Sequence, residues 1–193
     1  MKFLSKKSTA LILSAIMVIA STLISVNVKL GSEVRKVTDS FYKVGDTITD
    51  TGSYRSISSH LNNFCAYTDG LVTIADNYGI DTEDAYWASR WVKQAMTYSE
   101  DEIMYIYSEY SDLVIQTDKL IDQLYRADLN ERDASGLAQY ESSIEGAKSA
   151  IEAAASVYNS TVREFLAKND HFPTDFLAEL ADVEMPEYFG YGW

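Results

Sequence analysis

Residues 137–169, LAQYESSIEGAKSAIEAAASVYNSTVREFLAKN, decide the fold. Apolar side chains recur there every three or four residues, which is the spacing of one face of an α-helix. These positions are Leu137, Tyr140, Ile144, Ala147, Ile151, Ala154, Tyr158, Val162 and Phe165. A helix of these 33 residues is about 50 Å long, and it cannot bury such a stripe against itself. The stretch therefore predicts partner helices of similar length, arranged as an antiparallel up-and-down four-helix bundle.

The rest of the sequence also favours an all-α protein. Its first proline, Pro173, follows 172 residues without one, and proline is the residue that interrupts helices. Residues 57–78 have clean helical periodicity, and Gly79 predicts the end of that helix. Gly70 lies inside it at a cost of roughly 1 kcal/mol against alanine. We therefore expect a close helix contact or a local bend at Gly70.

Residues 82–127 carry one unbroken helical phase, with Trp87 and Trp91 beside a narrow face of small residues. Residues 99–102 nevertheless have the Ser-x-x-Glu form of a capping box, so one helix and two helices both stay open. The charged residues 130–133, followed by Ser135-Gly136, predict a turn before the long helix.

The amino terminus predicts a membrane segment. Residues 1–7 are basic, and residues 8–28 are 21 residues without a charge. As a helix they extend for about 31 Å, which matches the hydrocarbon core of a bilayer. An uncleaved transmembrane anchor and a signal peptide cleaved after Ala20 both stay open. Residues 32–50 continue the helical pattern as a stalk, which Gly45 and the polar residues 49–53 weaken.

Acidic residues dominate the remainder of the chain. Residues 1–30 hold four of the 16 lysine and arginine residues and none of the 29 aspartate and glutamate residues, so residues 31–193 carry a net charge of −17. This charge argues against nucleic acid as a partner. A basic end before the span and an acidic domain after it favour an amino terminus inside the cell and a domain outside.

The long helix and the tail contain a recognisable set of residues. They are Ile144-Glu145-Gly146-Ala147, Ile151, Ala154, Tyr158-Asn159, Val162, Phe165, Phe172-Pro173, Ala178 and Pro186-Glu187-Tyr188-Phe189. This pattern resembles the carboxy-terminal signature of the LemA family over residues 144–189. The resemblance implies a bacterial protein of the cytoplasmic membrane, with one amino-terminal membrane helix and an extracytoplasmic four-helix bundle. It implies no enzymatic activity.

The chain departs from the family pattern at polar positions, as a divergent member would. Ala154-Ala155 stands where the family has Ala-Arg, Phe165-Leu166 replaces a second Tyr-Asn pair, and Asp182 replaces a glycine. We interpret the retained residues as packing positions rather than as a site. They are Gly146, Ile151, Ala154, Tyr158, Asn159, Val162, Phe165, Phe172, Pro173, Ala178, Pro186, Tyr188 and Phe189.

The predicted organisation has four segments: a basic end (1–7), a membrane anchor or signal (8–28), a LemA-like helical bundle (32–182) and an aromatic tail (183–193). No catalytic, cofactor or metal site is predicted. The one cysteine, Cys65, has the helical spacing of a small core residue. His60 and His171 lack the Glu-x-x-His pattern of a di-iron bundle, and His171 is expected at a helix end.

Aromatic residues raise the question of a contact surface. Tyr98, Tyr105, Tyr107 and Tyr110 cannot share one helix face, so some of them must lie at the surface. They either fill the ends of the bundle or anchor a glycan or a protein. In the tail region we expect Phe172, Phe176 and Phe189 to fold over the end of the bundle. Tyr191 and Trp193 are expected to be available for contacts.

Two classes of function stay open. The favoured one is a non-catalytic, single-pass membrane protein that contacts the bilayer through residues 8–28. It would bind an unidentified protein of the bacterial cell envelope as an interaction or scaffold module, and self-association through coiled-coil packing stays open. The alternatives are an envelope hydrolase or other enzyme, for which no nucleophile with a base is evident, and a secreted helical protein after signal cleavage.

Overall fold

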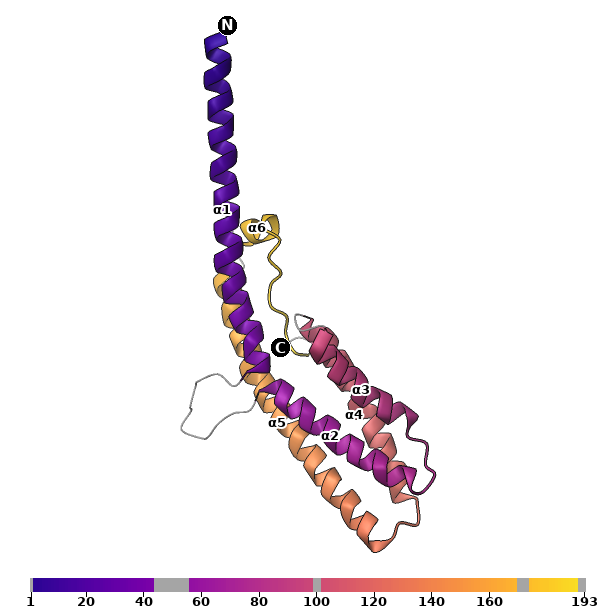
Figure 1. The fold of residues 1–193 in the computed structure, drawn as a ribbon. Coiled ribbons are helices and arrows are strands. Elements are labelled where there is room, and N and C mark those ends of the chain that lie inside the picture. Colours follow the sequence, from indigo (N-terminus) through magenta and orange to yellow (C-terminus); the bar gives the residue numbers. More distant parts are fainter. Residues whose placement is uncertain (1, 44–55, 99–101, 170–173, 191–193) are drawn as a thin grey trace. The chain divides into compact units, whose positions relative to one another are not determined.

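The computed structural model describes residues 2–43, 56–98, 102–169 and 174–190. These residues form helices and connections without a strand, which confirms the all-α prediction (Figure 1). The helices are α1 (Lys2–Tyr42), α2 (Ile57–Asp76), α3 (Glu83–Tyr98), α4 (Ile103–Tyr125), α5 (Glu131–Asn169) and α6 (Thr174–Leu180).

The chain forms two compact units. Unit 1 comprises residues 1–37 and 163–186, and unit 2 comprises residues 38–162 and 187–193. The helices α1 and α5 each contribute residues to both units. This division differs from the predicted segments, because the end of the long helix and α6 belong with the amino-terminal helix.

Helix α1 is the apolar element of unit 1. From Ala10 to Tyr42 it is long and apolar enough to cross a membrane, and its most apolar 18 residues have a mean hydropathy of 2.3. Most of its large apolar side chains between Leu11 and Val28 are 54–72% exposed within the chain, whereas Leu23 and Val26 are half-buried. The helix continues without interruption to Tyr42, as a stalk would. The predicted break at Gly45 and residues 49–53 lies outside the described residues.

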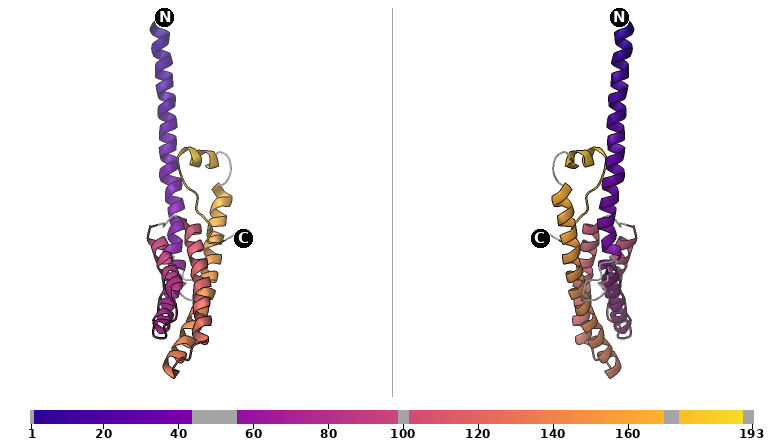
Figure 2. Two further views of the ribbon diagram at one scale, coloured as in Figure 1. Left: turned by 90° about the vertical axis from the view of Figure 1, so that its right-hand side faces the viewer. Right: turned by 90° about the vertical axis from the view of Figure 1, so that its left-hand side faces the viewer.

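The core of unit 2 lies between α2, α3, α4 and the part of α5 up to residue 162. The helices α2, α3 and α4 pack against one another (Figure 2). Helix α5 contacts α4 through Lys148 and Asp118, whose Nζ and Oδ1 atoms are 2.9 Å apart. Fully buried residues from all four helices fill the space between them; among them are Leu61, Phe64, Leu71, Val92, Ile106, Leu113, Leu120, Leu124, Leu137 and Ile144. Cys65 is buried too, as predicted.

Two glycine predictions are confirmed. A Cβ atom added to Gly70 would lie 2.7 Å from Cε1 and 2.8 Å from Oη of Tyr140, so α2 and α5 meet closely there. Gly79 follows the end of α2 with φ of +66°, a left-handed conformation that glycine adopts without strain.

The connections of unit 2 settle one alternative and correct one prediction. Residues 82–127 form two helices, since α3 ends at Tyr98 and α4 begins at Ile103. The predicted turn at residues 130–136 is wrong, because α5 already begins at Glu131. Asn130 caps this helix: its Oδ1 accepts a hydrogen bond of 2.9 Å from the N–H of Asp133. A good cap thus outweighs the turn preference of Ser135-Gly136.

Helix α6 buries Ala178 against its surroundings in unit 1. Phe176 and Leu180 on the same short helix are exposed. The expectation that Phe176 folds over the end of the bundle stays a prediction. The predicted positions of His171, Phe172, Pro173, Tyr191 and Trp193 lie outside the described residues.

Candidate functional site

Asn159 holds the carboxy-terminal tail against α5. Its side chain is 1% exposed. Its Nδ2 donates to the carbonyl oxygen of Phe189 at 3.0 Å, and its Oδ1 accepts from the N–H of Phe189 at 2.9 Å. One amide side chain thus pairs with both backbone groups of one buried residue. Because unpaired buried backbone groups are costly, this pairing fixes where the tail lies.

Two further hydrogen bonds secure the same segment. The Tyr158 hydroxyl donates to the carbonyl oxygen of Glu187 at 2.9 Å. Burial, together with the negative charge of Glu187, raises the pKa of Tyr158, so its hydroxyl stays a proton donor. The Glu187 carboxylate accepts from the N–H of Met104 at 2.9 Å. Because Glu102, at the N-cap of α4, makes no capping hydrogen bond with its own side chain, the tail supplies this cap.

An aromatic cluster surrounds the docked tail. The Phe189 ring centroid lies 5.5 Å from that of Phe41 and 5.1 Å from that of Tyr107. Tyr110 lies 6.0 Å from Phe189, and Tyr158 lies 5.8 Å from Phe41. Of the four clustered tyrosines, Tyr110 is buried and Tyr107 half-buried, whereas the other two, Tyr98 and Tyr105, are exposed. Part of this group therefore lies at the surface, as predicted.

The signature residues differ in their surroundings. Eight are buried: Ile151, Tyr158, Asn159, Val162, Phe165, Ala178, Pro186 and Phe189. Ala154 and Tyr188 are half-buried. Gly146 is exposed, and no atom lies within 4 Å of the Cβ it would carry, so it is not a packing position. The structure brings Tyr158, Asn159 and Phe189 together in unit 2. Phe172 and Pro173 lie outside the described residues.

A polar cluster joins α2 to α3. Ser89 Oγ donates to Asp69 Oδ1 at 2.8 Å, and Lys93 Nζ lies 2.7 Å from Asp69 Oδ2. Burial raises the pKa of the adjacent Cys65 thiol to about 11, so the thiol stays protonated at neutral pH. Since Ser89 is fully buried, a substrate cannot reach its hydroxyl. The partners are 20 and 24 residues apart, which explains why no local pattern indicated the cluster.

An exposed aromatic surface lies on α3. We define the α3 aromatic surface as Tyr86, Trp87, Arg90 and Trp91. Trp87 is 48% and Trp91 43% exposed, and their ring centroids are 6.0 Å apart. The Arg90 guanidinium lies 5.0 Å from the centroid of the Tyr86 ring. The sequence pattern placed both tryptophans beside the narrow buried face. Their spacing of four residues was the signal that they form one patch.

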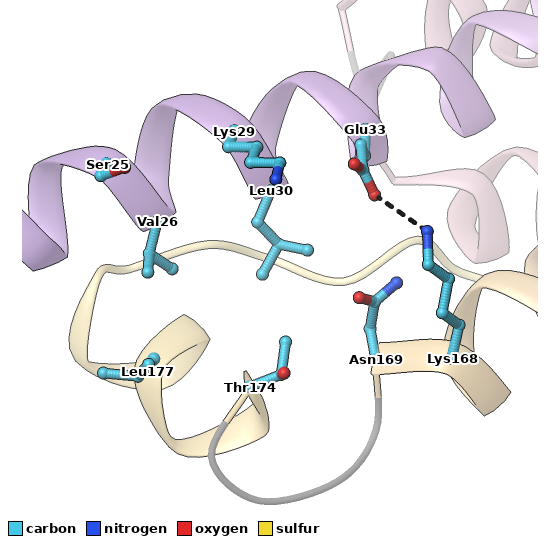
Figure 3. A pocket seen from close by; sticks show the side chains of 9 residues that line it. All are labelled: Ser25, Val26, Lys29, Leu30, Glu33, Lys168, Asn169, Thr174 and Leu177. Carbon is cyan, nitrogen blue, oxygen red and sulfur yellow. Dashed lines mark ion pairs between the residues drawn. The ribbon is translucent and has the colours of Figure 1, made fainter.

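A pocket of about 290 Å³ lies within unit 1 (Figure 3). Val26 and Leu30 point from α1 toward α6, which contributes Leu177. On the polar side, Lys168 Nζ lies 3.9 Å from Glu33 Oε2. The remaining lining residues are Ser25, Lys29, Asn169 and Thr174.

Within the described ranges, His, Cys, Asp and Glu side chains form no group of three or more that could hold a metal ion. Comparisons with models of protein families, with curated proteins and with solved structures gave no match to this chain.

Proposed function

We propose that this protein is a non-catalytic, membrane-anchored interaction module of the bacterial cell envelope, similar in kind to the LemA family. The exposed apolar side chains of α1 carry the proposal. Nine of them between Leu11 and Val28 are 54–72% exposed. Contact of so much apolar surface with water is unfavourable, so we expect lipid or another protein to cover this helix. A lipid bilayer fits a segment of this length and composition.

The proposed topology follows from charge. Lys2, Lys6 and Lys7 precede the span, and the acidic remainder follows it, which favours an amino terminus inside and both α3 and the tail outside. In the proposed arrangement α2, α3, α4 and α5 of unit 2 form an antiparallel four-helix bundle. A reporter fused after Trp193 should be active outside the cytoplasm. Activity in the cytoplasm alone would contradict this orientation.

The anchor is tested by replacing Ile16, near the middle of the span, by lysine. A central charge costs about 2.5–3.5 kcal/mol for membrane insertion, so Ile16→Lys should lower the fraction that resists carbonate extraction. The matched Ile16→Leu variant should behave as the unaltered chain. If the unaltered chain is itself extracted by carbonate, the anchor is wrong. The intact mass of the membrane form then separates a retained segment from one cleaved after Ala20.

The α3 aromatic surface is the proposed contact for a protein partner. Tryptophan, tyrosine and arginine are the residues that most often dominate protein interfaces. A sugar platform fits less well, because the Tyr86 and Trp87 rings stand at 79° to each other and Arg90 occupies the face of Tyr86. A photoreactive residue at the exposed neighbour Gln94 should therefore crosslink to a protein in intact cells.

The crosslink should depend on the tryptophans. We expect Trp87→Ala to lower its yield and Tyr125→Ala, an exposed aromatic on α4, to leave the yield unchanged. If the captured protein is a second copy of this chain, self-association is the function of the surface. Stoichiometric transition metal in the purified full-length chain would contradict the non-catalytic proposal.

A further inference from the structure

The pocket of unit 1 combines positive charge with an apolar wall. Lys29 and Lys168 line it from α1 and α5, and Val26, Leu30 and Leu177 form its apolar side (Figure 3). With Glu33 the lining carries two positive charges and one negative charge. A monoanion with an attached apolar chain complements this surface.

The pocket begins where the apolar part of α1 ends. Lys29 directly follows the uncharged residues 8–28. With a rise of about 1.5 Å per residue, its Cα lies one such step along the helix axis beyond the end of that segment. This inference rests on the proposed membrane span. If residues 8–28 cross the hydrocarbon core, Val26 lies at its edge and Lys29 lies among the lipid headgroups.

Helix α6 gives a second, independent indication of a lipid surface. Phe176 and Leu180 are four residues apart, so they share one face of α6, and both are exposed. The end of α6 is held beside α1, because Asn27 Nδ2 donates to the carbonyl oxygen of Ala181 at 2.8 Å. These exposed apolar side chains therefore lie at the level of the last residues of the span. At a bilayer surface they would be covered by lipid.

The charged groups can rearrange around a phosphate. Lys168 Nζ and Glu33 Oε2 are 3.9 Å apart, which is long for an ion pair, and Lys168 is largely exposed. Such a pair holds its lysine weakly, so a phosphate oxygen can replace the carboxylate. The Glu33 carboxylate then accepts hydrogen bonds from hydroxyl groups of the same headgroup.

We infer that this pocket binds the headgroup of an anionic phospholipid. The phosphodiester lies between Lys29 and Lys168, and an acyl chain follows Val26, Leu30 and Leu177. A headgroup with hydroxyl groups, such as that of phosphatidylglycerol, matches both the net charge of the pocket and the acceptor on Glu33. The pocket thus gives the anchor a preference for one class of lipid.

Native mass spectrometry of the full-length protein in detergent tests this assignment, with phosphatidylglycerol and phosphatidylcholine as the probes. We expect phosphatidylglycerol to bind roughly tenfold more tightly than phosphatidylcholine. The preference should vanish in the double variant Lys29→Gln/Lys168→Gln and return with arginine at both positions. Lys119→Gln, which removes a charge from α4, should keep the preference.

Equal binding of the two lipids by the unaltered chain would overturn the inference, as would a loss of preference in Lys119→Gln as large as in the double variant. Displacement of phosphatidylglycerol by inorganic phosphate at similar concentration would show that the pocket takes free anions, and it would overturn the lipid assignment. Flotation of the full-length chain with neutral vesicles is measured in parallel. A chain that floats but shows no lipid preference refutes only this inference, whereas a chain that does not float refutes the anchor.

Discussion

Replacing Asn159 by alanine tests whether two hydrogen bonds hold the tail on unit 2. If the tail stays docked, the buried N–H and carbonyl groups of Phe189 lose their partner, at a cost of about 1–3 kcal/mol each. If the tail leaves, exposure of the Phe189 ring costs about 1.5–3 kcal/mol, and loss of the Glu187 cap adds about 1 kcal/mol. The less costly route sets the outcome, so we expect a loss of about 2–4 kcal/mol.

The assay is urea unfolding of the full-length protein in detergent micelles, followed by far-UV circular dichroism. A chain that ends at Pro186 lacks the tail and sets the largest loss that tail release can cause. Asn62→Ala is the matched control, because Asn62 is an exposed asparagine whose amide donates to the Ser58 carbonyl within α2. We expect this control to change the free energy of unfolding by less than about 0.5 kcal/mol.

The double variant separates the hydrogen bonds from other effects of the substitution. In the chain that ends at Pro186, Asn159 has no tail to hold, so Asn159→Ala should cost only the packing of a few side-chain atoms, about 1 kcal/mol or less. An equal cost in the complete and truncated chains would refute the reasoning. The reasoning would also be refuted if Asn159→Ala in the complete chain were as stable as Asn62→Ala and its Phe189 amide were still protected from hydrogen exchange.

Three further predictions use the same unfolding assay. Ile151→Ala and Tyr158→Ala should each lower the free energy of unfolding by about 2–5 kcal/mol, since both side chains are buried. No change in either variant would contradict the assignment of this face of α5 to the core. Gly70→Ala should destabilise the protein by about 1 kcal/mol, because the added Cβ meets the Tyr140 ring. In a Tyr140→Ala background the ring is absent, so the same substitution should stabilise the protein by about 1 kcal/mol through the higher helix propensity of alanine. The Cys65 thiol has a pKa raised from 9.0 to about 11, so its contribution to stability is complete below pH 9 and declines as the pH rises toward 11. Cys65→Ala should therefore show a smaller loss between these pH values than the unaltered chain, and equal losses would contradict the shift.

The long stripe of α5 could be predicted because it depends on local periodicity. Ile144, Ile151, Tyr158 and Val162 are buried as the spacing requires. The start of α5 was predicted six residues late because Ser135-Gly136 resembles a turn. Glycine costs a helix only about 1 kcal/mol, and the cap from Asn130 together with burial of Leu137 offsets it.

The tail site could not be derived from spacing. Asn159 and Phe189 are 30 residues apart, and Glu187 and Met104 are 83 residues apart. These contacts join a side chain to a backbone group, so they leave no periodic signal and no complementary pair of residue types. The break between α3 and α4 stayed open in the sequence, because the apolar phase continues across it while residues 99–102 have the form of a capping box. The helix start at Ile103 receives its cap from the tail rather than from a neighbouring residue.

The position of Asn159 also bears on which surfaces are free to bind. A Tyr-Asn pair in a sequence signature invites a role in ligand binding, because both side chains carry hydrogen-bonding groups. Here Asn159 is 1% exposed and pairs with the Phe189 backbone, and the Tyr158 hydroxyl is used by Glu187. A ligand could reach either group only by displacing the tail. The polar pair therefore serves the internal structure of unit 2, which leaves the α3 aromatic surface and the pocket of unit 1 as the proposed contacts with other molecules.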